Sequence, residues 1–261
     1  MIIVPKIIFY INIKLNAVRR NIKLQICIMV PLALISYAEV GIFGESAKPL
    51  EIAEMSQIEK LTKSPAWNDR YRAAFLIGSS SIADTAWALE TLLKGIQIEL
   101  RNPSSLKMSP GSYATNSEKV LQKYVEVLVH LGPSIRISLR HSIDTLSGDF
   151  KNWIIIVLGF LKDESVHEEL KAIFSSSSNL FIRLMSIEAL GTYADTTDIP
   201  IILEAYSDTS KVTMTMDHDV PGGDFKEDIR PLVGAALFAL GKMGYTIQSE
   251  GDHIILKKLG D

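Results

Sequence analysis

The sequence predicts an all-α protein, an α-solenoid of about five helical hairpins, and three observations point to it. Apolar residues recur at helical spacing through the body of the 261-residue chain, as at Val120, Tyr124, Val127 and Leu128. Short breaks rich in Gly, Asp, Ser, Thr or Pro separate the helical segments. The same kind of segment ending returns five times along the chain, which indicates repeated helix pairs.

The repeated ending is an apolar residue followed by glycine. It occurs at Ile77-Gly78, Leu131-Gly132, Leu158-Gly159, Leu190-Gly191 and Leu240-Gly241. Five residues before these glycines stand positions that must pack closely, namely Ala73, Val127, Ile154, Ser186 and Ala236. A helix end often needs a left-handed residue, and glycine adopts that conformation without steric cost. We therefore expect Gly191 and its counterparts to end the first helix of each pair.

One unit carries a fuller motif. It consists of Ile182-Arg183, Ser186, Ala189-Leu190-Gly191, Asp195, Ile199-Pro200 and Leu203, and Arg70, Ala73 and Gly78 repeat its first part. On these residues the chain resembles, roughly over residues 55–244, the HEAT-like repeat family, of the phycobilin-lyase-type and armadillo-like variety. The resemblance implies an α-solenoid and a ladder of Arg and Asp between repeats. The other units depart from the motif, because Tyr124, Lys151 and Val233 stand where the arginine would be.

Further segments lie around and within the repeats. They are a linker at 39–54, insertions at 95–118 and 208–228, and a C-terminal cap at 245–261. The insertion 208–228 is acidic and lacks helical spacing, so we expect it to be mobile and dispensable for folding. Near the C-terminus, Tyr245–Gln248 and Ile254–Leu256 flank a Gly-Asp turn, which predicts a small β-hairpin. A continuing helix is the alternative there.

Residues 1–38 have the pattern of an export signal, either a signal peptide or an N-terminal anchor. The pattern runs from the basic Arg19, Arg20 and Lys23 through an apolar stretch, Leu24 to Ala38, that ends on the small Ser36 and Ala38. The stretch is about 15 residues, shorter than the ~20 that a membrane-spanning helix needs. We expect cleavage after Ala38 and a secreted, periplasmic or cell-envelope location. An uncleaved anchor and a buried helix are the alternatives.

The charge distribution argues against a nucleic-acid partner. All 30 acidic residues but only 22 of the 27 basic ones lie in residues 39–261, which therefore carry a formal charge of −8. Binding phosphates requires clustered Lys and Arg. Cleavage after Ala38 would also remove Cys27, the one cysteine, so no disulfide is expected. Contact with a membrane is expected only through an uncleaved N-terminal segment.

The acidic insertion is the one candidate for a metal site. Its carboxylates can offer oxygen ligands to a hard cation such as Ca²⁺, and the residues concerned are Asp217, Asp219, Asp224 and Asp228. Their spacing does not match the usual Ca²⁺ loop, so a solvated acidic loop is the main interpretation. The five histidines make no H-x-x-x-H pair, and no phosphate-loop or nucleophile-elbow motif appears. No catalytic residue and no cofactor is therefore expected.

Together these features predict an exported, non-catalytic scaffold that binds a protein partner. Stacked helix pairs offer an extended surface, and insertions often lie on the binding face, so Asp208–Asp228 is the candidate protein-binding segment. Two alternatives stay open. One is an enzyme or chromophore-attachment factor resembling the phycobilin lyases, and the other is a structural spacer in a cell-envelope assembly.

Overall fold

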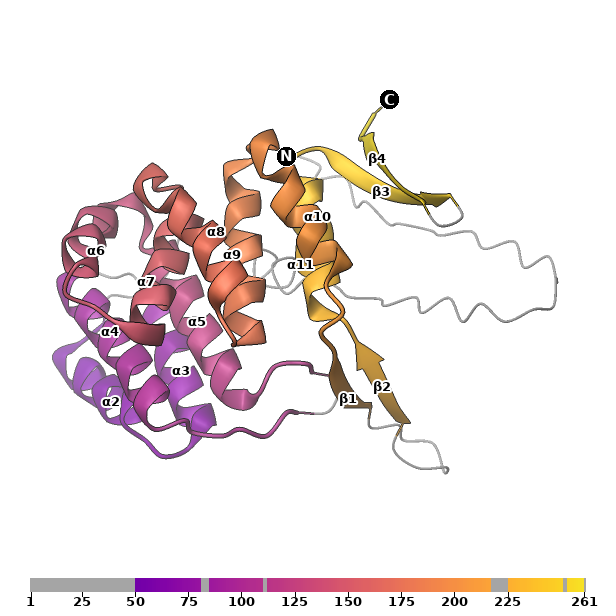
Figure 1. Cartoon of the computed structure of the whole chain (residues 1–261). Coiled ribbons are helices and arrows are strands. Elements are labelled where there is room, and N and C mark those ends of the chain that lie inside the picture. Colours follow the sequence, from indigo (N-terminus) through magenta and orange to yellow (C-terminus); the bar gives the residue numbers. More distant parts are fainter. Residues whose placement is uncertain (1–49, 81–84, 110–111, 217–224, 251–252, 261) are drawn as a thin grey trace, which may run out of the picture.

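A computed structural model describes residues 50–80, 85–109, 112–216, 225–250 and 253–260 (Figure 1). Within these ranges the chain forms ten α-helices and two small two-stranded sheets. The helices are α2 (Ile52–Thr62), α3 (Trp67–Gly78), α4 (Thr85–Arg101), α5 (Asn116–His130), α6 (Arg136–Ile143), α7 (Gly148–Phe160), α8 (His167–Ser176), α9 (Leu180–Tyr193), α10 (Ile199–Ser207) and α11 (Pro231–Lys242). Three short 3-10 helices lie between them, η2 (Gly132–Ile135), η3 (Glu164–Val166) and η4 (Thr196–Asp198).

The helices lie in two rows (Figure 1). One row consists of α3, α5, α7, α9 and α11, each packed against the next. The other consists of α2, α4, α6, α8 and α10, each packed against the helix that follows it in the chain. The predicted, mostly helical body is therefore confirmed. None of the described helices has the length and apolarity needed to span a membrane, and the predicted export signal at 1–38 lies outside the described residues.

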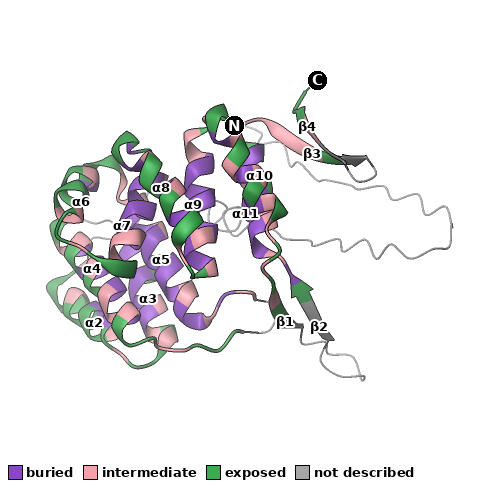
Figure 2. Cartoon of the chain, viewed as in Figure 1, coloured by how far each residue is buried: buried purple, intermediate pink, exposed green. Residues whose placement is uncertain are grey.

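The row from α3 to α11 forms the core (Figure 2). Seven successive residues of α7, from Trp153 to Gly159, are buried, so this helix is covered on every side. Trp153, Tyr124 and Phe174 are the largest side chains with almost no exposure. The Trp153 ring lies 6.0 Å from that of Phe181 on α9, an aromatic contact within the row.

The repeated glycines do not all end their helices as expected. Gly132 does, because it follows α5 with a φ of +78°. Gly191 lies inside α9, and the left-handed residue that ends this helix is Ala194, with a φ of 56°. The same offset of three residues separates Gly159 from Lys162 and Gly241 from Gly244, both left-handed, with φ values of 56° and 82°. The prediction was wrong for Gly191 because the glycine serves a different purpose there.

Gly191 lets two helices approach each other closely. A Cβ atom on residue 191 would lie 2.6 Å from the Ala239 Cα of α11 and 2.8 Å from its Cβ, far inside normal van der Waals separation. A Cβ on Gly159 would lie 3.0 Å from Ala189 Cβ of α9, and 2.6 Å from Leu170 Cδ1, the end of a flexible side chain. Glycine is therefore selected at these positions by helix packing and not by backbone conformation.

The first insertion is shorter than predicted. Helix α4 continues to Arg101, so residues 95–101 are helical and only residues 102–115 connect α4 to α5. The prediction placed the break at Gly95, but that glycine is buried inside α4 against the Tyr124 ring. A glycine within a helical pattern was mistaken for a helix end.

The second insertion contains a β-hairpin. Strands β1 (Val212–Met216) and β2 (Phe225–Ile229) pair antiparallel, with Val212 opposite Ile229. Met214 is buried, as is Ile229 just beyond the insertion, and the expected mobility and dispensability of the segment stay predictions. Apolar and polar residues alternate along Val212–Met216, which is the period of a strand and not of a helix.

The predicted C-terminal hairpin is confirmed, and the alternative of a continuing helix is wrong. Strands β3 (Tyr245–Glu250) and β4 (His253–Lys258) pair antiparallel, with Ile247 opposite Leu256. Strand β3 packs on α11, and its apolar side chains join the edge of the core.

Candidate functional site

The acidic insertion, where the sequence placed its candidate metal ligands, is described only at its ends. Asp217, Asp219 and Asp224 lie outside the described residues. Asp228 lies on β2, where its Oδ1 accepts a hydrogen bond from Thr213 Oγ1 of β1 at 2.7 Å. This bond joins the two strands of the hairpin, which is a structural role for the Asp228 carboxylate.

Arg70 forms a buried network at the base of the first insertion. Its Nη1 lies 2.7 Å from Glu99 Oε2 and its Nε donates to Ser64 O at 2.6 Å. Glu99, which is fully buried, accepts further bonds from Ser104 N at 2.7 Å and from the Ser117 hydroxyl. A buried ion pair needs such additional donors to offset its desolvation. The network therefore fixes the start of the insertion to α3, α4 and α5.

Arg183, in the sequence unit with the fullest motif, likewise bonds to two other segments of the chain. Its Nε donates to Phe174 O of the preceding helix at 3.0 Å, and its Nη2 donates to Asp208 Oδ2 at 2.6 Å. The family ladder joins repeats through an arginine and a turn aspartate, and the turn aspartate of this unit is Asp195. Asp195 instead caps η4, where its Oδ1 accepts from Thr197 N at 2.9 Å.

A polar cluster lies where α8 meets the turn before α10, and we call His167, Lys171, Asp195 and Asp198 the His167 cluster. His167 Nε2 lies 2.7 Å from Asp198 Oδ2, and Lys171 Nζ lies 2.9 Å from Asp198 Oδ1. The Asp198 side chain is 0% exposed. One ligand atom from each of His167, Asp195 and Asp198 lies within 4.8 Å of the others.

The surroundings fix the imidazole of this cluster. The Tyr193 ring packs on His167, with 4.6 Å between centroids, and Tyr193 Oη donates to Asp163 O at 2.6 Å. Burial, followed by nearby carboxylates, raises the pKa of Tyr193, so the phenol keeps its proton and its donor role. The hydrogen bond from Thr197 N lowers the pKa of Asp195, which keeps this carboxylate ionised at neutral pH.

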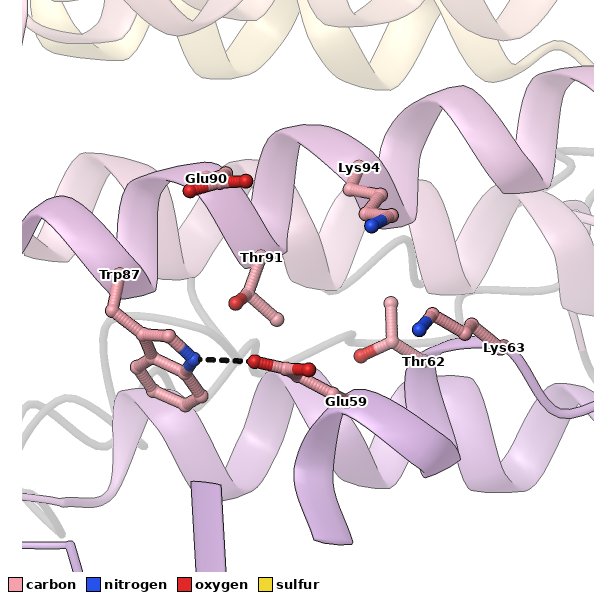
Figure 3. A pocket seen from close by; sticks show the side chains of 7 residues that line it. All are labelled: Glu59, Thr62, Lys63, Trp87, Glu90, Thr91 and Lys94. Atoms are coloured by element: carbon pink, nitrogen blue, oxygen red, sulfur yellow. Dashed lines mark hydrogen bonds between the residues drawn. The ribbon is translucent and has the colours of Figure 1, made fainter. Parts of the chain in front are cut away.

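A second feature is a small groove between α2 and α4, with a volume of about 110 Å³ (Figure 3). It is lined by Glu59, Thr62, Lys63, Trp87, Glu90, Thr91 and Lys94. Trp87 Nε1 donates to Glu59 Oε1 at 2.9 Å on one side, and the ammonium groups of Lys63 and Lys94 lie on the other. The four charged side chains are exposed, so water screens their fields. The groove is thus a shallow surface feature with opposite charges at its two ends.

No protein-family model matches the chain, and searches of curated proteins and of solved structures found no match. The resemblance to HEAT-like repeats therefore stays a prediction from the sequence motifs.

The sequence does not predict the His167 cluster, because its members lie about 30 residues apart, at the start of α8 and before α10. Histidine pairs within one helix were considered, whereas His167 begins α8 and the aspartates belong to the next turn. In the predicted repeats, His167 and Ile199 begin corresponding helices of neighbouring helix pairs. Residues just before Ile199 are therefore expected beside His167 when these pairs pack together.

Proposed function

We propose that this chain is an exported HEAT-like α-solenoid that acts as a non-catalytic scaffold and binds a protein partner. The observation that carries the proposal is the serial packing of α3, α5, α7, α9 and α11. In a solenoid each unit contacts its neighbours, which leaves a long surface for binding. Repeated turn features support the same interpretation, since Asp163 and Asp195 cap η3 and η4 at equivalent places.

The β1–β2 hairpin is the contact element that we propose. It projects from the helical rows (Figure 1), and within the described residues its sheet has two strands only. Each strand of a two-stranded sheet has one edge whose backbone groups are available to a third strand, and partner segments often bind by strand addition. The formal charge of −8 on residues 39–261 favours a partner with a basic surface.

The hairpin can be removed without opening the helical body. Arg230 Nε donates to Asp208 O at 2.8 Å and its Nη2 donates to Tyr206 O at 2.9 Å, so the base of the insertion is closed by bonds outside the strands. Replacement of residues 211–229 by a short Gly-Ser linker leaves these contacts in place. We expect the variant to keep the helical circular dichroism of the parent chain.

The experiment is a comparison of partners captured by the parent chain and by the linker variant from the host organism. The scaffold proposal expects a partner that binds the parent chain directly with purified components and binds the variant at least tenfold more weakly. Equal binding would move the contact surface away from the hairpin. A direct partner for neither chain would contradict the scaffold proposal itself.

A further inference from the structure

The His167 cluster has more negative charge than its cation neutralises. Lys171 Nζ is shared between Glu168 Oε1, at 2.8 Å, and Asp198 Oδ1, at 2.9 Å. The cluster itself contains two carboxylates, Asp195 and Asp198, and the exposed Glu168 beside it also binds the one ammonium group. Asp198 Oδ1 is fully buried, and the Lys171 ammonium at 2.9 Å is its ionic partner. A divalent ion beside Asp198 would add positive charge to a carboxylate that is buried and shares its ammonium partner with Glu168.

The preceding junction provides a comparison in which the charges balance. There Asp163 is the buried carboxylate, and Arg140 binds it with two nitrogens, Nη2 to Oδ1 at 2.5 Å and Nε to Oδ2 at 3.1 Å. Asp163 also caps η3 through Ser165 N at 3.0 Å. One guanidinium therefore satisfies one carboxylate at that junction. The His167 cluster replaces the guanidinium with an ammonium group and adds both an imidazole and a second aspartate.

We propose that His167, Asp195 and Asp198 form a binding site for a divalent metal ion of the zinc class. An imidazole nitrogen and two carboxylate oxygens are ligands that Zn²⁺ accepts, and three protein ligands leave a coordination position for water or for a partner's side chain. Ligand atoms around Zn²⁺ lie roughly 3–4 Å apart, given bonds of about 2.0–2.2 Å. The three groups already lie within 4.8 Å of one another, so small side-chain rotations are sufficient.

The surroundings match those of a metal-bound imidazole. His167 coordinates through Nε2, which now contacts Asp198 Oδ2, and carries its remaining proton on Nδ1. Glu168 Oε1 lies 4.0 Å from Nδ1, beyond hydrogen-bonding distance, and would have to move closer to accept that proton. A carboxylate acceptor of this kind is the usual neighbour of a metal-bound histidine. The packed Tyr193 ring limits the rotation of the imidazole, so the ligand is oriented before the ion arrives.

The site joins two successive units of the array. His167 is the first residue of α8, whereas Asp195 and Asp198 bracket η4 ahead of α10. A bound ion would therefore join the start of α8 to the turn that precedes α10. Because the ion binds the folded chain and not the unfolded one, it should raise the melting temperature in proportion to its affinity.

The test uses the full chain, stripped with a chelator and titrated with Zn²⁺ alone in a calorimeter and by thermal unfolding. Two variants remove ligands with little effect on the fold: Asp195→Asn, since asparagine still caps a helix, and His167→Gln. His141→Gln, an exposed histidine of α6, is the matched control. Co²⁺ is a second probe, because its visible absorption reports nitrogen and oxygen ligation.

We expect one Zn²⁺ to bind the parent chain and the control equally, with a rise in melting temperature. Each ligand variant should lose at least tenfold in affinity together with most of that rise, and its Co²⁺ spectrum should revert to that of the aqueous ion. Absence of binding to the parent chain would overturn the proposal. Binding that survives both ligand variants would overturn it as well, because the ion would then lie elsewhere on the chain.

Discussion

The close packing of α9 against α11 gives the sharpest test of the fold. Alanine at position 191 places a Cβ atom 2.6 Å from Ala239 Cα and 2.8 Å from Ala239 Cβ. The obstructing atoms belong to backbone and to a side chain without rotamers, so neither can turn aside, and the two helices must separate. Gly191→Ala therefore tests whether α9 and α11 approach as closely as described.

The expected magnitude follows from two opposing effects. Overpacking of a core costs about 1–3 kcal/mol, and a clash with backbone belongs at the upper end of that range. Alanine is favoured over glycine inside a helix by about 1 kcal/mol. The net loss in unfolding free energy is therefore about 2 kcal/mol. Gly241→Ala is the matched control, because a Cβ there meets no atom within 4 Å, and it should be stabilised by up to ~1 kcal/mol.

Urea unfolding followed by circular dichroism measures both variants, and a double-mutant cycle with Ala239→Gly identifies the cause. Removing the Ala239 Cβ should restore part of the loss in the Gly191→Ala background, although the backbone of residue 239 still obstructs the new methyl group. If position 191 needed a left-handed residue instead, the two substitutions would add without coupling. Equal stabilisation by Gly191→Ala and Gly241→Ala would refute the close approach of the two helices.

Three further predictions concern other parts of the chain. Burial, and then the charge of Glu126, raises the pKa of Glu188 to about 8. Because this folded-state pKa lies above the unfolded one, the unfolding free energy should fall by several kcal/mol from about pH 4.5 to pH 8. Glu188→Gln should flatten that fall in a pH series of urea unfolding curves. Ala194→Gly should stabilise the chain by about 1 kcal/mol, because alanine is strained at a φ of 56°, and an unchanged or lower midpoint would argue against the left-handed helix end. Protein from the host should begin at Glu39 when its N-terminus is sequenced, whereas an intact Met1 would contradict cleavage of the export signal.

The sequence predicts elements more reliably than their ends. Helical spacing correctly identifies the body of the chain, and the two apolar stretches around residue 251 correctly predict the C-terminal hairpin. Glycine is ambiguous, because it serves both at left-handed turns and at close helix packing. Gly132 and Gly191 stand in the same local pattern and take one role each. Only the distance to Ala239, which is remote from Gly191 in the sequence, decides between the two roles.

The candidate sites were harder to predict for a related reason. Arg183 matches the family motif, yet its ionic partner is Asp208, a residue that the motif does not contain. Glu99 lies in a stretch assigned to a loop, and it proves to be a buried partner of Arg70. Such pairs depend on which units become neighbours and in what register, and composition and short-range spacing do not contain that information.

The metal proposal follows from a shift of register between two equivalent turns. At the first junction a single residue, Asp163, both caps the 3-10 helix and accepts the basic side chain of the preceding unit. At the second junction these two roles are divided, since Asp195 caps η4 and Asp198, three residues later, accepts Lys171. Two carboxylates therefore stand at the second junction, where the first junction has one. Asp198 also contacts the His167 imidazole at 2.7 Å, so the two aspartates and the imidazole form the ligand set of the proposed ion.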